Sequence, residues 1–474
     1  MKKLILTACM AAFLAAPAMA QVDLSRYVAL GDSLTAGVAS GGLMDYYQLR
    51  SYPALLAELG GTPVFEMPLI APPGLAPALE LKSLSPLVIG PTDVLPPADP
   101  LDYFYNVTLE APYQNLAIPG SDTYDLLFTT GNIFNLLAGN TDNVMHDLIL
   151  RTPEVQDPVT GEIVDFTALV AAISQQPTLV TVWIGNNDAF GAVTAATVID
   201  GVTLTPVDAF ALYYNQIVGA LATSLPNADI VVFTVFGNVD WVPFATTVPN
   251  MVEVPGFGVV QLQGENGPIE AGDYLTLLAS SLIAQGYGLP IPGAPPLPED
   301  LDLATGAPGV ILRADEVAAI NGRVAAFNAI VNDVADLYPN VHVFDVNPLL
   351  GQLGAGTYRT FGGVELTTDF LVGGIYSYDG FHLQNVGQGV IAYELIEFLN
   401  RELGAGLPQV DMHEILTEGG WQAAGSGLVC VTCDPKQAVL TDQAFKQLYE
   451  LFLPDLARRW RQQAAEVAHS SSLD

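Results

Sequence analysis

The stretch YVALGDSLTAG, residues 27–37, gives the first indication of the fold. An apolar, β-prone run ends at Gly31-Asp32-Ser33, and small residues then lead into a helix-like segment. A strand that turns into a helix in this way is typical of a parallel α/β sheet. Gly-Asp is common in turns and serine is a frequent helix N-cap, so Gly31-Asp32-Ser33 alone fits a simple turn as well as a functional site.

The same alternation of apolar runs and amphipathic segments continues along most of the chain. Strand-like runs are found at 27–30, 115–118, 179–184, 229–236 and 341–346. Helical periodicity is found at 52–59, 208–224, 314–337 and 387–403. Crossover helices on both faces of such a sheet give a doubly wound α/β fold, which we therefore predict.

Three long insertions interrupt this alternation, at about 62–112, 125–170 and 241–312. Residues 62–112 hold 11 prolines, and residues 241–312 are apolar and rich in proline and glycine. Loops of this length are usually functional or disordered, and the aliphatic and aromatic content of these three argues against disorder. We predict one domain over 21–407 with three insertions, and a C-terminal extension, 408–474, that includes an amphipathic helix at 441–467.

The first 20 residues have the pattern of a secretory signal peptide. Lys2 and Lys3 precede a short apolar run, and Ala18-Met19-Ala20 is a small-x-small cleavage site. No later run of about 20 apolar residues exists, so we predict no transmembrane segment. The expected location is therefore secreted or periplasmic.

The charge and the cysteines limit the possible partners. The chain has 50 Asp and Glu against 15 Lys and Arg, a net charge of −35, and such a field repels nucleic acid and anionic membrane surfaces. No Ca²⁺-loop motif is present, and we predict neither a metal nor a cofactor. Cys430 and Cys433 form a lone C-V-T-C pair; zinc needs about four ligands, so a local disulfide is the favoured prediction.

Three more polar clusters each follow a predicted strand: NLAIPG at 115–120, WIGNND at 183–188 and YDGFHL at 378–383. The chain has no G-x-S-x-G, H-E-x-x-H, Walker A or G-x-G-x-x-G motif. In order and spacing, GDSL at 31–34, the glycine of NLAIPG, GNND at 185–188 and D-x-x-H at 379–382 resemble the four blocks of the SGNH, or GDSL-type, ester hydrolases. The resemblance covers about 25–403, and the C-terminal extension lies outside it.

A catalytic triad can be argued from the residues themselves. A serine hydroxyl becomes a good nucleophile only when a base takes its proton, so Ser33 needs an imidazole. Among the five histidines, His382 is distinguished by Asp379 three residues earlier, a spacing that puts both side chains on one side of a helix or turn. Residues and resemblance both predict Ser33 as nucleophile, His382 as general base and then acid, and Asp379 as the group that orients the imidazole.

The resemblance also implies an oxyanion hole and a more specific fold. Its donors would be the backbone N–H groups of Ser33 and Gly120 and the side-chain amide of Asn187. Glycine suits position 120 because no Cβ blocks approach to its N–H. Asp32 and Asp188 are expected to hold their loops together. The implied fold is flavodoxin-like, a three-layer α/β/α core with the site at the carboxyl ends of the strands.

The resulting expectation is an exported, metal-independent serine ester hydrolase of the lipase and esterase type. The apolar insertions favour small-molecule or lipid esters with apolar acyl chains. One alternative is a carbohydrate acetylesterase with the same triad. Another is a non-catalytic surface or binding protein on a hydrolase scaffold, attached through the basic terminal helix that carries Arg458, Arg459 and Arg461. No oligomeric state is predicted.

Overall fold

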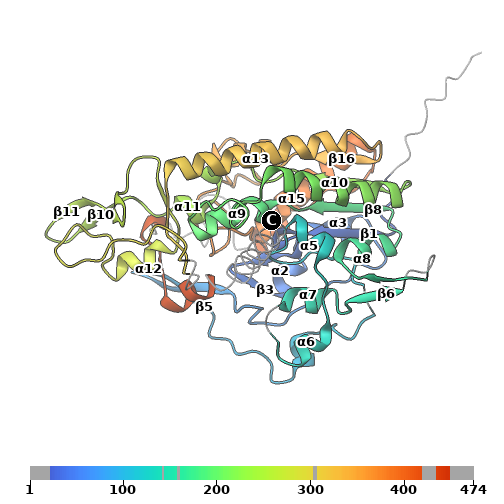
Figure 1. Ribbon diagram of the computed structural model, residues 1–474, viewed down its shortest axis with the longest axis horizontal. Helices are drawn as coiled ribbons and strands as arrows, with labels where there is room; N and C mark the ends of the chain where they lie inside the picture. The colour runs from blue at the N-terminus through green and yellow to red at the C-terminus, as the bar shows by residue number, and fades with distance from the viewer. Residues whose placement is uncertain are drawn as a thin grey trace, which may run out of the picture.

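The core is a four-stranded parallel sheet (Figure 1). A computed structural model describes residues 22–110, 112–140, 143–156, 161–302, 307–418 and 434–448. Three predicted features lie outside these residues: the signal peptide at 1–20, the C-V-T-C pair, and the three arginines of the terminal helix. The spatial order is β1 (Tyr27–Gly31), β8 (Leu179–Trp183), β9 (Asp229–Phe233) and β16 (Val341–Phe344). Every residue of β1 and β8 is buried, as expected for parallel strands covered on both faces.

The fifth predicted strand, 115–118, is an extended segment rather than a regular strand. It runs parallel to β1, since Ala29 N donates to Gln114 O, Leu116 N to Ala29 O and Ile118 N to Gly31 O, at 2.9, 2.9 and 3.0 Å. On the outer edge of this segment, away from β1, the Asn115 side chain accepts from Ala117 N through Oδ1 at 3.1 Å. This segment lies beside β1, so the sheet reads, from one edge to the other, segment 115–118, β1, β8, β9 and β16. If these five are numbered in chain order, the spatial order is 2-1-3-4-5, which is the flavodoxin-like order.

Helices flank the sheet as the periodicity predicts: α3 (Tyr52–Leu59), α10 (Val207–Ser224), α13 (Ala314–Ala335) and α15 (Asn385–Glu402). α10 packs against α13, with the rings of Phe210 and Phe327 stacked 3.9 Å apart, and α15 packs against α3. Tyr52 of α3 contacts the rings of Trp183 and Phe233 on the sheet. The predicted α/β/α core is confirmed.

Two strands are shorter than predicted at their carboxyl ends. β9 ends at Phe233 and β16 at Phe344, whereas the apolar runs continue to 236 and 346. Beyond these points, side-chain oxygens rather than strand carbonyls accept from the backbone N–H groups: Val235 N donates to Asn328 Oδ1 at 2.8 Å, and Val346 N donates to Thr234 Oγ1 at 3.0 Å. The apolar pattern therefore marks burial there rather than strand pairing.

The three insertions contain secondary structure of their own. The first forms the antiparallel pair β4 (Leu79–Leu84) and β5 (Leu87–Pro91) and the short helix α4 (Pro100–Tyr103). The second region contains α5 (Thr123–Phe128), α6 (Ile133–Leu137), α7 (Val144–Ile149), β6 (Glu154–Gln156), β7 (Ile163–Asp165) and α8 (Ala168–Ser174). The third contains α11 (Pro243–Thr246), β10 (Met251–Val254), β11 (Gly258–Gln261), β12 (Gln263–Gly264), β13 (Gly267–Pro268), β14 (Tyr274–Leu275), α12 (Ala279–Ala284) and β15 (Ile311–Leu312). The β10–β11 hairpin extends furthest from the sheet, at the left of Figure 1.

The described part of the C-terminal extension packs on the body of the protein. α16 (Met412–Glu418) lies against α15. Further along, β17 (Val439–Leu440) pairs in parallel with β5, which gives a three-stranded sheet in the order β17-β5-β4. Residues 442–448 are helical, and they appear in red beside β5 in Figure 1. Leu440 and Leu448 are buried in the same hydrophobic core as the sheet.

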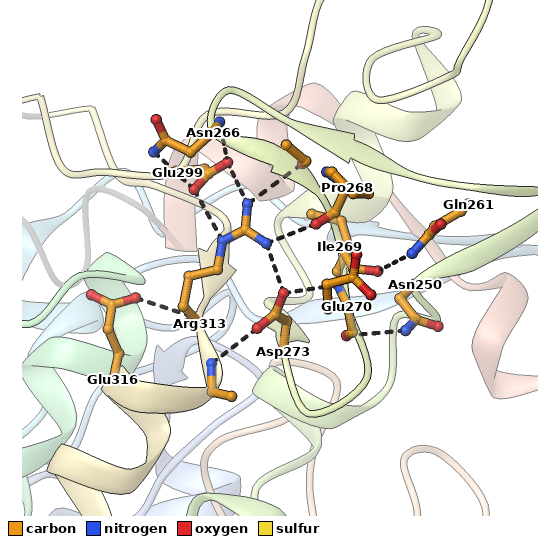
Figure 2. Close-up of polar contacts among 12 residues, drawn as sticks. Asn250, Gln261, Asn266, Pro268, Ile269, Glu270, Asp273, Glu299, Arg313 and Glu316 are labelled. Atoms are coloured by element: carbon orange, nitrogen blue, oxygen red, sulfur yellow. Dashed lines mark hydrogen bonds and ion pairs between the residues drawn. The ribbon is translucent and has the colours of Figure 1, made fainter.

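A buried ion-pair cluster joins the third insertion to α13 (Figure 2). Arg313, the residue before α13, contacts Asp273 Oδ2 through Nη1 at 2.7 Å and Glu299 Oε1 through Nη2 at 2.6 Å. Only 7% of the Asp273 side chain and 5% of the Glu299 side chain are exposed. Burial by itself raises the pKa of both carboxyls, but hydrogen bonds from the backbone and from Arg313 outweigh it and hold both pKa values below the ordinary range.

We expect Arg313→Met to lower the free energy of unfolding by about 3 kcal/mol at neutral pH, because it leaves two buried carboxylates without their cation. Chemical denaturation measures this loss. Because their pKa values are lower in the folded than in the unfolded protein, the two carboxylates stabilise the wild type fully only at pH values above the ordinary carboxyl pKa. This stabilisation is lost as the pH falls through the folded-state pKa values. The difference in unfolding free energy between Arg313→Met and wild type should therefore narrow towards about pH 3. Arg401→Met, which removes an exposed ion pair with Glu402, should cost less than about 1 kcal/mol; equal losses in the two variants would contradict the argument.

Candidate active site

Ser33, His382 and Asp379 form one hydrogen-bonded chain. Ser33 is the first residue of α1 (Ser33–Ala36), directly after β1, and the other two lie in the loop before α15. His382 Nε2 is 2.9 Å from Ser33 Oγ, and His382 Nδ1 is 2.9 Å from Asp379 Oδ2. All three side chains are buried, with Ser33 the most exposed at 7%. The structure thus brings together residues 349 positions apart, in the arrangement that the sequence predicts.

Asp379 is surrounded by donors. Its Oδ1 accepts the backbone N–H groups of Phe381 and His382, both at 2.8 Å, and its Oδ2 accepts Gly41 N at 2.6 Å as well as the imidazole. Burial raises the pKa of this carboxyl, but the charge and hydrogen bonds of His382 and the backbone donors together hold it below its ordinary value. An ionised carboxylate can only accept, so His382 Nδ1 carries a proton in both the charged and the neutral ring. In the neutral ring Nε2 is then left to accept from the Ser33 hydroxyl.

The turn that presents Ser33 is fixed by its neighbours. A Cβ on Gly31 would lie 2.3 Å from Thr35 Oγ1 and 2.6 Å from the carbonyl oxygen of Trp183, so only glycine fits between the strand and α1. Asp32 caps α1 by accepting Leu34 N at 2.9 Å, and it also accepts Asn186 Nδ2 at 3.0 Å. Burial raises the pKa of Asp32 to about 6 against these two hydrogen bonds. Asp32 therefore links the Ser33 turn to the GNND loop.

The predicted oxyanion residues lie on adjoining loops. Gly120 has a positive φ of 84°, a conformation that glycine adopts without strain. Asn187, in α9 (Asn186–Ala195), donates from Nδ2 to the carbonyl oxygen of Ser121 at 2.8 Å, so its amide lies beside the Ser121–Asp122 peptide, which directly follows the Gly120–Ser121 peptide. The N–H of Ser33 belongs to the first turn of α1, where backbone donors have no acceptor within the helix.

Asp188, the residue after Asn187, connects the start of α9 to the start of α5. Its two carboxylate oxygens accept Thr123 Oγ1 at 2.8 Å and Thr123 N at 3.0 Å, at the start of α5. The side chain is 1% exposed. The sequence-based expectation that Asp32 and Asp188 connect loops agrees with these contacts.

Several neighbours of the site carry no recognisable sequence signal. Gln388 donates to the Leu34 carbonyl at 2.8 Å and accepts from Tyr52 N at 2.9 Å, which fixes α1 to α15 and α3. His146 of α7 is buried, with Nε2 3.3 Å from Ser121 Oγ. Neither residue belongs to a motif, so only the three-dimensional arrangement reveals them.

Among the described residues, no three His, Cys, Asp or Glu side chains are arranged to hold a metal ion. Within the same residues, no helix is long and apolar enough to cross a membrane.

The sequence model of the GDSL-like lipase/acylhydrolase family matches residues 27–395. The chain belongs to this family. That match spans all four motif blocks, and it confirms the family resemblance. No curated protein sequence matches this GDSL-family chain at a significant level.

Several solved structures are similar to this GDSL-family chain, all at low identity. The family 3 carbohydrate esterase of Clostridium thermocellum has 12% identity and a TM-score of 0.31, over 80% of this chain and 98% of that chain. Phospholipase A1 of Streptomyces albidoflavus NA297 has 15% identity and a TM-score of 0.30, over 78% and 98%. The extracellular lipase of Streptomyces rimosus has 15% identity and a TM-score of 0.29, over 80% and 98%.

Proposed function

We propose that this protein is an exported serine hydrolase that cleaves carboxylic esters. The hydrogen-bonded chain from Ser33 Oγ through His382 to Asp379 carries the proposal. Membership of the GDSL-like family supports an ester as the substrate class. The signal-like pattern of residues 1–20 supports export to the periplasm or beyond.

In the proposed reaction, Ser33 Oγ attacks the carbonyl carbon of the ester while His382 Nε2 takes the hydroxyl proton. The negative charge that develops on the carbonyl oxygen is stabilised by the N–H groups of Ser33 and Gly120 and by Asn187 Nδ2. The carbon–oxygen bond to the alcohol then breaks, and His382 gives its proton to the leaving oxygen. In the second half, water attacks the acyl carbon while His382 Nε2 takes its proton. The bond between that carbon and Ser33 Oγ then breaks, His382 returns the proton to Oγ, and the acid is released.

Covalent labelling tests this proposal directly. A fluorophosphonate probe reacts with an activated serine, so incubation of the wild type should add one label, and peptide mapping should place it on Ser33. Hydrolysis of p-nitrophenyl butyrate should stop as labelling is completed. Absence of both labelling and hydrolysis would favour a non-catalytic binding protein instead.

We further propose that the first insertion favours apolar acyl chains. A small hydrophobic cluster joins this insertion to α1 and the following strand, β2 (Val38–Ala39). Its buried members include Ala36, three residues after Ser33, together with Val38 and Ile70, and Phe104 packs on it from the insertion. The insertion thus lies directly against the helix that carries the nucleophile.

For p-nitrophenyl esters we expect kcat/KM to rise from acetate through butyrate to hexanoate, by up to about fourfold for each buried CH₂. Phe104→Ala should flatten this rise and leave acetate hydrolysis nearly unchanged. Phe361→Ala, which removes a half-buried ring that packs on Tyr393, serves as the control and should keep the gradient. A wild-type preference for acetate would reject the acyl-chain proposal and favour the carbohydrate acetylesterase.

A further inference from the structure

The Ser40–Gly41 turn connects the candidate triad to the rest of the molecule. It joins the short strands β2 and β3 (Gly42–Leu43), and both turn residues have positive φ, 54° and 68°. Gly41 N donates to Asp379 Oδ2 at 2.6 Å, the same oxygen that accepts from His382. Ser40 N donates to Ser377 Oγ at 2.7 Å. The position of this turn therefore affects how the Asp379 carboxylate is held.

The C-terminal segment 434–448 lies against the outer side of this turn. A Cβ on Gly41 would be 3.1 Å from Leu448 Cδ2 and 3.6 Å from Gln447 Nε2, so these two side chains face the turn and leave no room for a larger residue there. Leu448 is fully buried. On the other side, Leu79 N of β4 donates to the Ser40 carbonyl at 2.7 Å. The turn is thus enclosed between β4, the triad loop and the C-terminal segment.

The segment is itself firmly attached to two insertions. Thr441 N donates to the Ile89 carbonyl of β5 at 2.9 Å, next to the parallel pairing of β17 with β5. Leu440 N donates to Ser280 Oγ of α12 at 3.2 Å. Asp442 Oδ1 accepts from Ser281 Oγ of α12 and from Nε2 of Gln285, the residue that follows α12, at 3.2 and 3.1 Å. These contacts fix where Leu448 meets the turn.

We propose that segment 434–448 positions the triad: Leu448 holds the Ser40–Gly41 turn against Asp379, and Asp379 in turn directs His382 towards Ser33. The inference rests on the proposed function, because it assigns a role in that same reaction. Leu448 is a positioning residue and touches no reacting atom. Without its side chain the turn loses its outer wall, Gly41 N can move away from Asp379, and the imidazole loses part of its orientation.

The test compares two buried leucines of the same segment, Leu448→Ala and Leu440→Ala. The three atoms nearest to a Cβ on Gly41 belong to Leu448, Gln447 and Leu79 rather than to Leu440, and the backbone bonds that attach the segment survive truncation of Leu440. Rates with p-nitrophenyl butyrate are expressed per active site, titrated with the fluorophosphonate probe. We expect Leu448→Ala to lower kcat by roughly 10- to 100-fold with KM within about twofold of wild type, and Leu448→Met to restore most of the loss.

Leu440→Ala should lower Tm about as much as Leu448→Ala while it keeps the wild-type kcat per titrated site. An unchanged kcat in Leu448→Ala, or an equal loss of kcat in both alanine variants, would overturn the inference while the wild type still hydrolyses the ester. A wild type that is neither active nor labelled at Ser33 would instead reject the proposed function, and this inference with it.

Discussion

Replacing Ser33 with alanine is expected to lower kcat for p-nitrophenyl butyrate by about 10⁴-fold or more. The Ser33 hydroxyl, 2.9 Å from His382 Nε2, is the proposed nucleophile, so its removal abolishes the acyl-enzyme route. His382→Ala should cost about as much, because an unassisted serine hydroxyl is a weak nucleophile. Steady-state kinetics with purified variants, corrected for folded protein by circular dichroism, measure both losses.

The double variant Ser33→Ala, His382→Ala provides the control for this prediction. Residues that act as one unit are strongly non-additive, so the second substitution should lower kcat little further. Asp379→Asn keeps the size of the side chain but favours the wrong tautomer of His382, and it should cost about 10⁴-fold. Near-normal turnover in either single alanine variant would refute the triad, and strictly multiplicative losses would show that the residues act independently.

The site residues that belong to a sequence motif can be predicted, even where they lie far apart in the chain. The carboxyl ends of parallel strands meet at one edge of the sheet, so Ser33 after β1, Gly120 after the segment 115–118 and Asn187 after β8 are expected there. The prediction that YDGFHL at 378–383 follows a strand is wrong, because this block lies in the loop before α15 with no strand directly before it. The spacing of Asp379 and His382 also predicted their contact. The structure adds the reason: one oxygen of Asp379 accepts two backbone N–H groups, which leaves the other to hold the imidazole.

The long-range supports of the site could not be predicted from sequence. Gly41 lies 338 residues from Asp379, and its role depends on a turn whose outer wall comes from Leu448 near the end of the described chain. The pairing of β17 with β5 likewise joins two short apolar runs with no distinctive pattern. Such contacts depend on how insertions pack against each other, and local periodicity carries no information about that packing.

The second large effect concerns Asn187. We expect Asn187→Ala to lower kcat by about 10²- to 10³-fold with little change in KM, because the amide is proposed to bind the oxyanion of the transition state more strongly than the ester carbonyl. The same side chain also holds the carbonyl of Ser121 at 2.8 Å, so a loss of activity has two possible origins.

Thr123→Val separates these two origins. It removes the hydrogen bond from Thr123 Oγ1 to Asp188, the residue after Asn187, and keeps the size of the side chain. If loosening of the contacts between the Gly120–Thr123 loop and α9 were enough to lower kcat, Thr123→Val would lose activity to the same degree as Asn187→Ala. We expect instead a lower Tm with kcat within about threefold of wild type. This contrast would assign the loss in Asn187→Ala to the missing amide donor, because loosening of the loop alone would lower kcat in both variants.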